Sequence, residues 1–144
     1  PYDTVSNEKK TYGGGWTPKN YGGTSGGSVT LEEALVHSMN IPTIDLANKV
    51  GMKKILDTAE ACGISTLVKD GKRNDDNLAA SIGGLTNGVS VYDMAKAYSV
   101  FANGGKLIEP TAIMKVVDRN GNVLEDHSGK PEGKQVVSEN AVYR

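Results

Sequence analysis

The stretch Val29-Thr-Leu-Glu-Glu-Ala-Leu-Val-His-Ser-Met-Asn-Ile-Pro42 predicts a helix around which the rest of the chain is organised. Thr30 is placed to cap the first turn, and Glu33 three residues later completes a capping box, because each side chain can satisfy a backbone N–H that lacks a partner. The helix is therefore expected to start at Leu31. Its apolar residues recur at helical spacing and would attach one face to a core: Leu31, Ala34 and Leu35.

The end of this helix carries a hydroxyl and a carboxamide two residues apart. Pro42 disfavours helical geometry in the residue before it, so the helix is expected to end near Met39 or Asn40. Ser38 and Asn40 would then lie at a helix terminus, where side chains can point into a cleft. A Ser-x-Asn tripeptide alone is a weak signal, and the alternative is that both residues only cap the helix.

A second block of sequence gives the tripeptide its context. It consists of short runs in a defined order: Ala80-Ser81-Ile82-Gly83-Gly84-Leu85, Gly88-Val89-Ser90, Met94-Ala95, Ala97-Tyr98 and Phe101-Ala102-Asn103-Gly104-Gly105. With these runs, the chain from about Trp16 to Arg144 resembles the transpeptidase domain of the class A penicillin-binding proteins. The resemblance implies an α+β fold of the serine β-lactamase type, of which this chain would be a mainly helical fragment with a C-terminal β-hairpin.

The resemblance also implies the chemistry. Members of this family form an acyl-enzyme on a serine, using a Ser-x-x-Lys motif, a Ser-x-Asn motif and a Lys-Thr/Ser-Gly motif. By resemblance, Ser38 would belong to the proton-relay network around the nucleophile, and Asn40 would hydrogen-bond the peptide substrate and help to position the motif lysine. The implied partners are peptidoglycan stem peptides and β-lactam antibiotics. The implied location is extracytoplasmic. The protein would be attached to the membrane through segments not present here.

Only the middle motif is recognised in this chain. A literal Ser-x-x-Lys occurs at Ser6-Asn7-Glu8-Lys9, but no apolar residue accompanies it to bury a catalytic helix, and Lys10-Thr11 is followed by Tyr12 instead of Gly. The chain is therefore expected to be a fragment that is inactive alone. It begins without Met, and residues 138–144 begin a helix with no room to finish. Such a fragment would be able to form a homodimer that covers apolar surface. The competing interpretation is a non-catalytic binding or assembly module.

Composition limits the classes of partner and site that this chain can have. The net charge is −1, so nothing favours a nucleic acid or an anionic membrane surface. No apolar run approaches the 18 or more residues that span a bilayer. The single cysteine, Cys62, excludes an internal disulfide and a multi-thiolate metal site, and it is expected to be a buried, inert thiol. No cofactor or metal is predicted.

The chain divides into four stretches by pattern. Residues 1–28 read as a glycine-rich loop, residues 29–105 as a helical subdomain, residues 106–137 as a β-hairpin region with its turn at Asn120-Gly121, and residues 138–144 as the start of a truncated helix. Further helices are expected at residues 43–50 and 52–62, with Gly63 as a left-handed cap. The longest helix is expected after Ser90, its cap, with a buried stripe: Val91, Met94, Ala95, Tyr98, Phe101 and Ala102.

Three further expectations concern loops. Trp16 and Tyr21 are expected to anchor the first loop to the domain, with direct ligand contact as the alternative. Asp75-Asp76 is expected to lie on the surface, because no His or further carboxylate at ligand spacing accompanies it. Close backbone packing is expected at Gly83-Gly84.

His37 and Ser38 are adjacent in a predicted helix and would point about 100° apart, so a His–Ser dyad is not expected.

Overall fold

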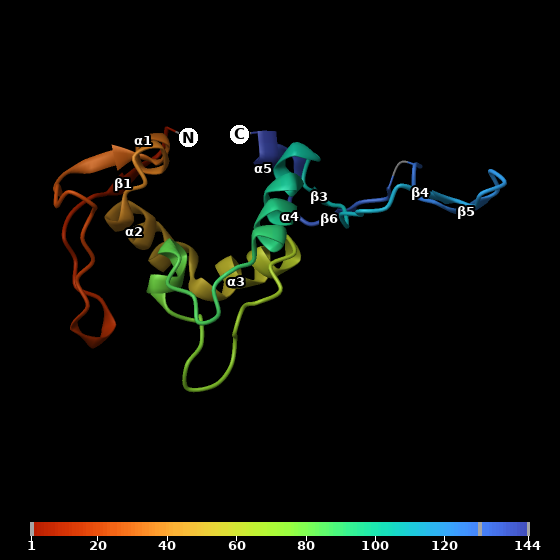
Figure 1. The fold of residues 1–144 in the computed structure, drawn as a ribbon. Helices are drawn as coiled ribbons and strands as arrows, with labels where there is room; N and C mark the ends of the chain where they lie inside the picture. The colour runs from red at the N-terminus through yellow and green to blue at the C-terminus, as the bar shows by residue number, and fades with distance from the viewer. Residues whose placement is uncertain (1, 130, 144) are drawn as a thin grey trace. The chain divides into compact units, whose positions relative to one another are not determined.

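A computed structural model describes residues 2–129 and 131–143 of the chain (Figure 1). Arg144, the last residue of the expected C-terminal helix, and Lys130, in the expected polar loop, lie outside the described residues. The chain forms two compact units. The first contains the residues up to Asp57 together with Thr66–Gly88, and the second contains Thr58–Ser65 together with the residues from Val89 onward.

The first unit combines a short two-stranded sheet with helices. Strands β1 (Thr4–Ser6) and β2 (Ser28–Thr30) pair antiparallel, with Val5 opposite Val29. The remaining elements are the 3₁₀ helices η1 (Gly13–Gly15) and η2 (Leu78–Ile82), helices α1 (Leu31–Val36) and α2 (Asn40–Val50), and the first part of α3 (Met52–Ala61). Residues 1–28 are therefore not loop throughout, because β1 lies within them and β2 begins at their end.

Helix α1 starts as predicted and ends earlier than predicted. The Thr30 hydroxyl accepts a hydrogen bond from the backbone N–H of Glu33 at 3.1 Å, which confirms the cap. The helix ends at Val36 rather than near Met39 or Asn40. The reason is that Ser38 adopts a left-handed backbone conformation, with φ at 49°, which no continuous right-handed helix accommodates.

Helix α2 begins at Asn40, three residues before the expected start. Pro42 is therefore the third residue of α2, a position it tolerates because the N–H groups of a first helical turn have no intrahelical partner. Ile41 and Ile44 are 2% and 0% exposed, and α2 contacts α1, β1 and η2. This helix is thus the centre of the first unit.

Helix α3 ends close to its predicted boundary. Gly63 has φ at 102°, and the Ile64 N–H donates to the Ala59 carbonyl at 3.1 Å, as expected of a left-handed cap followed by a residue that folds back. Met52 and Leu56 join Ala47 of α2 in a buried cluster within the first unit. Cys62 is 6% exposed and burial raises the pKa of its thiol, which confirms the expected buried site.

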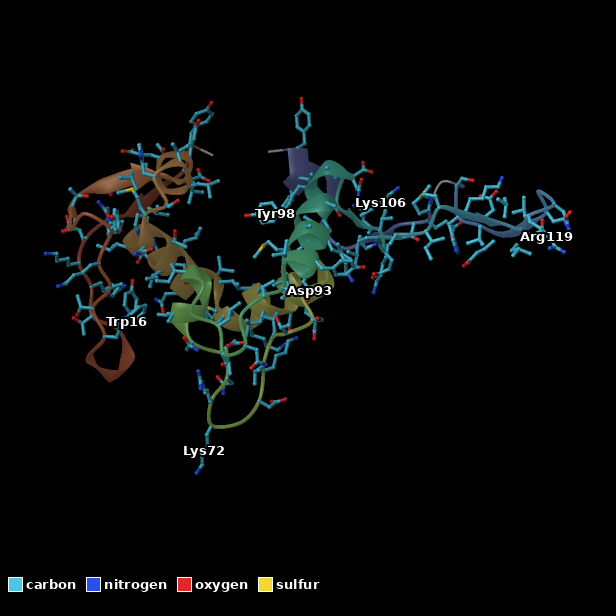
Figure 2. The ribbon with its side chains drawn as sticks, in the orientation of Figure 1. Trp16, Lys72, Asp93, Tyr98, Lys106 and Arg119 are labelled. Carbon is cyan, nitrogen blue, oxygen red and sulfur yellow. The ribbon has the colours of Figure 1, made fainter. Side chains whose placement is uncertain are left out.

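In the second unit, the helix expected after Ser90 is present as α4 (Val91–Ala102), and the Ser90 hydroxyl caps it by accepting from the Asp93 N–H at 3.0 Å. The predicted buried stripe is wrong. Val91 is 88% exposed and Tyr98 is 68% exposed, and the other members of the stripe are exposed as well: Met94, Ala95, Phe101 and Ala102. Figure 2 labels Tyr98 on α4.

Helix α4 packs through its opposite side. Its buried residues are Asp93, Ala97 and Val100. The Asp93 carboxylate accepts hydrogen bonds from the Ser65 N–H at 2.9 Å and the Ser65 hydroxyl at 2.7 Å. These bonds lower the pKa of Asp93, first through the hydroxyl and then through the backbone N–H. Helical spacing shows which residues share a face, whereas this polar anchor decides which face is buried.

The rest of the second unit is a set of short strands and one short helix. Strand β3 (Lys106–Leu107) pairs antiparallel with β6 (Lys134–Gln135), and β4 (Lys115–Val117) pairs antiparallel with β5 (Val123–Asp126). The predicted turn joins β4 to β5, with Arg119 at its tip (Figure 2) and Gly121 at φ 84°. Helix α5 (Glu139–Tyr143) begins after Ser138 as expected. The prediction of a mainly helical α+β chain with a hairpin is confirmed.

The loop before η2 contradicts one expectation. Asp75 is fully buried, not on the surface, while Asp76 is exposed. The Asp75 carboxylate accepts from the backbone N–H groups of Val68 at 2.8 Å and Thr86 at 2.6 Å. Burial alone would raise the pKa of Asp75, but these hydrogen bonds lower it. The close packing expected at the glycine pair is confirmed at Gly84, where an added Cβ would lie 2.8 Å from the Ala79 carbonyl oxygen.

Candidate functional site: the Ser38–Asn40 turn

Ser38 lies in the turn that ends α1. The Ser38 N–H donates to the Leu35 carbonyl at 3.0 Å, and the Met39 N–H donates to the Ala34 carbonyl at 2.8 Å. This pair of bonds defines a Schellman motif, in which the residue at the Ser38 position is usually glycine because its φ is positive. Among the described residues, Ser38 is the only non-glycine with positive φ. Its side chain is exposed.

Asn40 lies at the first position of α2 and is half-buried. Its Nδ2 donates to the Lys19 carbonyl oxygen at 2.9 Å, across 21 residues of sequence. The side chain therefore ties the helix start to the preceding loop. This bond uses one of the two amide hydrogens.

A second tie joins the same two segments. Asn20 Oδ1 accepts from the Ile41 backbone N–H at 2.9 Å, and Asn20 itself is 7% exposed. Its Nδ2 donates to Asn7 Oδ1 at 2.7 Å and to the Thr24 carbonyl at 2.8 Å. Sequence reasoning assigned no role to Asn20, so its position between these two segments was missed.

A hollow of about 370 Å³ opens beside Ser38 within the first unit. Its lining includes Asn20, Tyr21, Glu33, His37 and Ser38. Tyr21 is 99% exposed, so the expectation that it anchors the loop is wrong, and direct ligand contact remains for it as the alternative. Trp16, in contrast, is half-buried and packs at 6.3 Å between ring centroids against Tyr12 of the same loop, so its role as an anchor to the domain stays a prediction.

The literal Ser-x-x-Lys lies in a different setting. Ser6 is the last residue of β1, and its hydroxyl accepts from the Glu8 N–H at 3.2 Å. Ser6 and Lys9 are therefore not one turn apart on a helix, which is the placement that a catalytic Ser-x-x-Lys requires. The structure brings together Ser38 and Asn40 with Asn20 and leaves Ser6 in a short edge strand.

Within residues 2–129 and 131–143, no group of three or more His, Cys, Asp or Glu side chains is arranged to hold a metal ion. In the same residues, none of the helices is both long enough and apolar enough to cross a bilayer.

Comparison with known proteins gives the class. Residues 1–143 match the family described as penicillin binding protein transpeptidase domain. The match covers nearly the whole chain, so the chain belongs to this family. The expected resemblance is confirmed.

Individual relatives agree. The chain is 36% identical over 138 residues to penicillin-binding protein 1F of Bacillus subtilis, covering 96% of this chain and 18% of that protein. It is 36% identical over 129 residues to penicillin-binding protein 1B of Haemophilus influenzae, covering 90% of this chain and 15% of that protein. The chain thus spans less than a fifth of these relatives.

A solved structure shares the fold. PonA1, a penicillin-binding protein of Mycobacterium tuberculosis, superposes with a TM-score of 0.85 at 29% identity, over 98% of this chain and 39% of that chain. The PonA1 protein has also been solved in complex with penicillin V, with a TM-score of 0.81 at 30% identity, over 96% of this chain and 38% of that chain.

Proposed function

We propose that this chain is the central part of a peptidoglycan D,D-transpeptidase and supplies its Ser-x-Asn motif. In the whole enzyme, a serine oxygen attacks the carbonyl between the two D-Ala residues of a stem peptide, forms an ester and releases the terminal D-Ala. An amine of a neighbouring stem peptide then attacks the ester, forms the cross-linking amide and frees the serine. A β-lactam is opened by the same serine, and its acyl group stays on the enzyme.

The observation that carries this proposal is the backbone of Ser38. A left-handed conformation costs a non-glycine residue roughly 1–2 kcal/mol, and glycine would occupy the position without that cost. A strained residue is a reasonable sign of function. The hydroxyl of Ser38 both donates and accepts a hydrogen bond, as a group that passes a proton between a nucleophilic serine and a lysine must do.

Asn40 would bind the peptide substrate. Its Nδ2 donates one hydrogen to the Lys19 carbonyl, and this bond orients the amide plane. The second hydrogen and the carbonyl oxygen remain to meet an N–H or C=O of an extended peptide and to hold the motif lysine. This use of both ends of one carboxamide explains why a simple acceptor such as Asp would not replace it.

We propose further that the nucleophile and the Lys-Thr-Gly motif come from segments outside these 144 residues, so that the chain alone is not acylated. The position of Ser6 in β1 supports this proposal, since Ser6 is the serine of the chain's only literal Ser-x-x-Lys. The penicillin V complex of the PonA1 protein supports β-lactams as ligands of the whole enzyme. We place that enzyme outside the cytoplasm, attached to the membrane through other segments.

The test is the intact mass of two proteins after incubation with excess benzylpenicillin. The full-length protein is expected to gain one penicilloyl group, and the 144-residue chain none. The full-length Asn40→Ala variant is expected to be acylated slowly, and the loss of its hydrogen bond to the Lys19 carbonyl should lower the unfolding temperature only slightly. A stoichiometric adduct on the 144-residue chain would place the nucleophile within it. Normal acylation of the Asn40→Ala variant, with reduced stability, would favour the non-catalytic module.

We also propose that the isolated chain forms homodimers through α4. In a solution of the isolated chain, a second copy is the partner available to cover this face of α4. The face is apolar and exposed, with Val91 88% and Phe101 52% exposed, which supports the proposal. A hollow of about 440 Å³ lies along the same helix, lined in part by Met94 and Tyr98. Sedimentation should show a concentration-dependent dimer that the Met94→Lys variant loses; a monomer at all concentrations would contradict this.

A further inference from the structure

The first turn of α2 receives its capping interaction from a residue 21 positions earlier. Met39, the residue before α2, makes no side-chain hydrogen bond to the helix start. The Ile41 N–H is one of the orphan donors of the first turn, and it is satisfied by Asn20 Oδ1 at 2.9 Å instead. Ile41 is 2% exposed, so without Asn20 this N–H would be buried and unpaired.

The orientation of the Asn20 amide is fixed by its other partners. Both groups that face Nδ2, the Asn7 Oδ1 at 2.7 Å and the Thr24 carbonyl at 2.8 Å, are acceptors. An Asn amide has two N–H donors and one carbonyl, so using both donors there leaves Oδ1 to face Ile41. The side chain is buried as well, which removes water as a competing partner.

The connection reaches the Ser-x-Asn motif directly. Two successive residues of the loop bond to two successive residues of α2, because the Lys19 carbonyl accepts from Asn40 and Asn20 accepts from Ile41. These two bonds set the position at which α2 starts, and the strained Ser38 turn lies immediately before it. Displacing catalytic groups by 1 Å can cost about 10²-fold in rate, so this tie matters for chemistry.

We propose that Asn20 is a positioning residue for the Ser38–Asn40 turn, acting through its hydrogen bond to the Ile41 N–H. This inference rests on the proposed function, because it assumes that the turn takes part in acylation. Asn20 does not contact the reacting atoms itself. Its effect is to hold Asn40 and Ser38 at a fixed distance from a nucleophile supplied by another segment.

The test uses the full-length protein and measures acylation by benzylpenicillin. Three readouts are taken for each variant: the fraction acylated at the end of the reaction, the first-order rate constant at saturating β-lactam, and the midpoint of thermal unfolding. Asn20→Leu removes every hydrogen bond of the side chain at similar volume. Asn20→Asp keeps an acceptor for the Ile41 N–H and loses both donors, so it serves as the conservative variant.

We expect Asn20→Leu to reach the wild-type acylated fraction with a rate constant lower by about tenfold or more. Asn20→Asp should keep a rate constant close to wild type although its unfolding midpoint falls. Equal rate constants for wild type and Asn20→Leu would overturn the proposal, and so would an equal loss of rate in both variants. If Asn20→Leu does not fold, Asn20→Ala decides: it removes the acceptor for the Ile41 N–H without adding a bulky apolar group and should slow acylation, whereas a wild-type rate would overturn the proposal.

The matched control is Asn77→Ala. Asn77 also supplies an amide cap, since its Oδ1 accepts from the Ala79 N–H at 3.1 Å at the start of η2 in the same unit. Its side chain donates to the Asn74 carbonyl and accepts from the Ala79 N–H, both outside the motif. Its loss should therefore lower the unfolding midpoint without changing the rate constant; a slower rate here would make the effect of Asn20 non-specific and overturn the proposal. Failure of the wild-type protein to be acylated would refute the proposed function instead.

Discussion

Helices α1 and α3 end in the same backbone motif and differ in the residue at its left-handed position. In α3 that residue is Gly63, whose N–H donates to the Glu60 carbonyl at 2.9 Å. In α1 the corresponding residue is Ser38, with φ at 49°. The two bonds that close each motif span the same numbers of residues.

The difference separates stability from function. Two features favour glycine at position 63. Its positive φ carries no energetic cost for glycine, and an added Cβ would collide with the Lys96 side chain. Ser38 carries the energetic cost of a positive φ, and its side chain is exposed instead of packed in the core. A helix end optimised for stability is thus of the Gly63 kind, and the Ser38 end carries a hydroxyl at a cost in stability.

The largest expected effect is on activity, from Ser38→Gly. In the full-length protein, the rate of acylation by benzylpenicillin should fall by about 10²–10⁴-fold, the usual contribution of a positioned proton-transfer group. In the 144-residue chain, the free energy of unfolding should stay the same or rise by up to about 1 kcal/mol, because relief of the left-handed strain outweighs the extra freedom of glycine when unfolded.

Ser38→Ala is the control for this change. It removes the same hydroxyl and keeps a Cβ in the left-handed region, so it should lose activity equally without any gain in stability. Retained activity in either variant, measured as acylation rate, would remove Ser38 from the proton relay. A clear loss of stability in Ser38→Gly would contradict the strain argument.

The reciprocal change, Gly63→Ser, is expected to be the largest effect on stability. A serine there takes on the left-handed cost of roughly 1–2 kcal/mol, and the Lys96 side chain must also move. Lys96 pairs with Glu109, which is 71% exposed, so this displacement adds little. Urea unfolding of the 144-residue chain measures the total.

Gly71→Ser separates the two contributions. Gly71 has φ at 95° and open space around its Cβ position, so this variant carries the conformational cost alone. Gly63→Ser should therefore be destabilised slightly more than Gly71→Ser, by the small cost of moving the Lys96 side chain. An unchanged unfolding free energy in Gly63→Ser would mean that the left-handed cost is small in this fold, and the interpretation of Ser38 would lose its basis.

Sequence reasoning succeeded where the determining interactions are local. The caps at Thr30 and Ser90 and the left-handed cap at Gly63 were predicted from residues within one turn, and all three are present. The glycine pair and the hairpin turn at Gly121 follow the same rule. The Ser38–Asn40 pair was also found from local sequence, although its roles in catalysis stay predictions.

It failed at one residue whose type does not indicate its backbone conformation, and at two places where residues elsewhere along the chain decide. The end of the first helix was placed too late, because a serine gives no sign that it will adopt a positive φ. The apolar stripe of α4 was assigned to the core, whereas the hydrogen bonds of Asp93 to Ser65, 28 residues away, turn the other face inward. Asp75 was placed on the surface for the same reason, since its partners Val68 and Thr86 are not adjacent to it in sequence.

The N-termini of α4 and α2 are capped in different ways. Ser90 caps α4 from the adjacent position, whereas α2 depends on Asn20. Ser90→Ala should destabilise the chain by about 1 kcal/mol and leave acylation of the full-length protein unchanged. Ser99→Ala on the same helix is the control, because its hydroxyl donates to the Lys96 carbonyl within the helix and is not needed there. Equal unfolding free energies for the two variants would contradict the cap.

The smallest effect should come from the exposed side of α3. Asp57 accepts from Lys53 at 2.6 Å and Lys69 at 2.8 Å, and these hydrogen bonds lower the pKa of its carboxyl to about 2. A carboxyl whose pKa is lower in the folded chain adds stability above its unfolded pKa of about 4, and loses that contribution as the pH falls through about 2.

Asp57→Asn should therefore be slightly less stable than wild type at pH 6, and the difference should vanish near pH 2. Because these ion pairs face solvent, 1 M salt should shrink the difference at pH 6 as well. Thermal unfolding of both proteins across this range gives the answer. A difference that persists at low pH or in salt would mean that Asp57 acts through packing rather than charge.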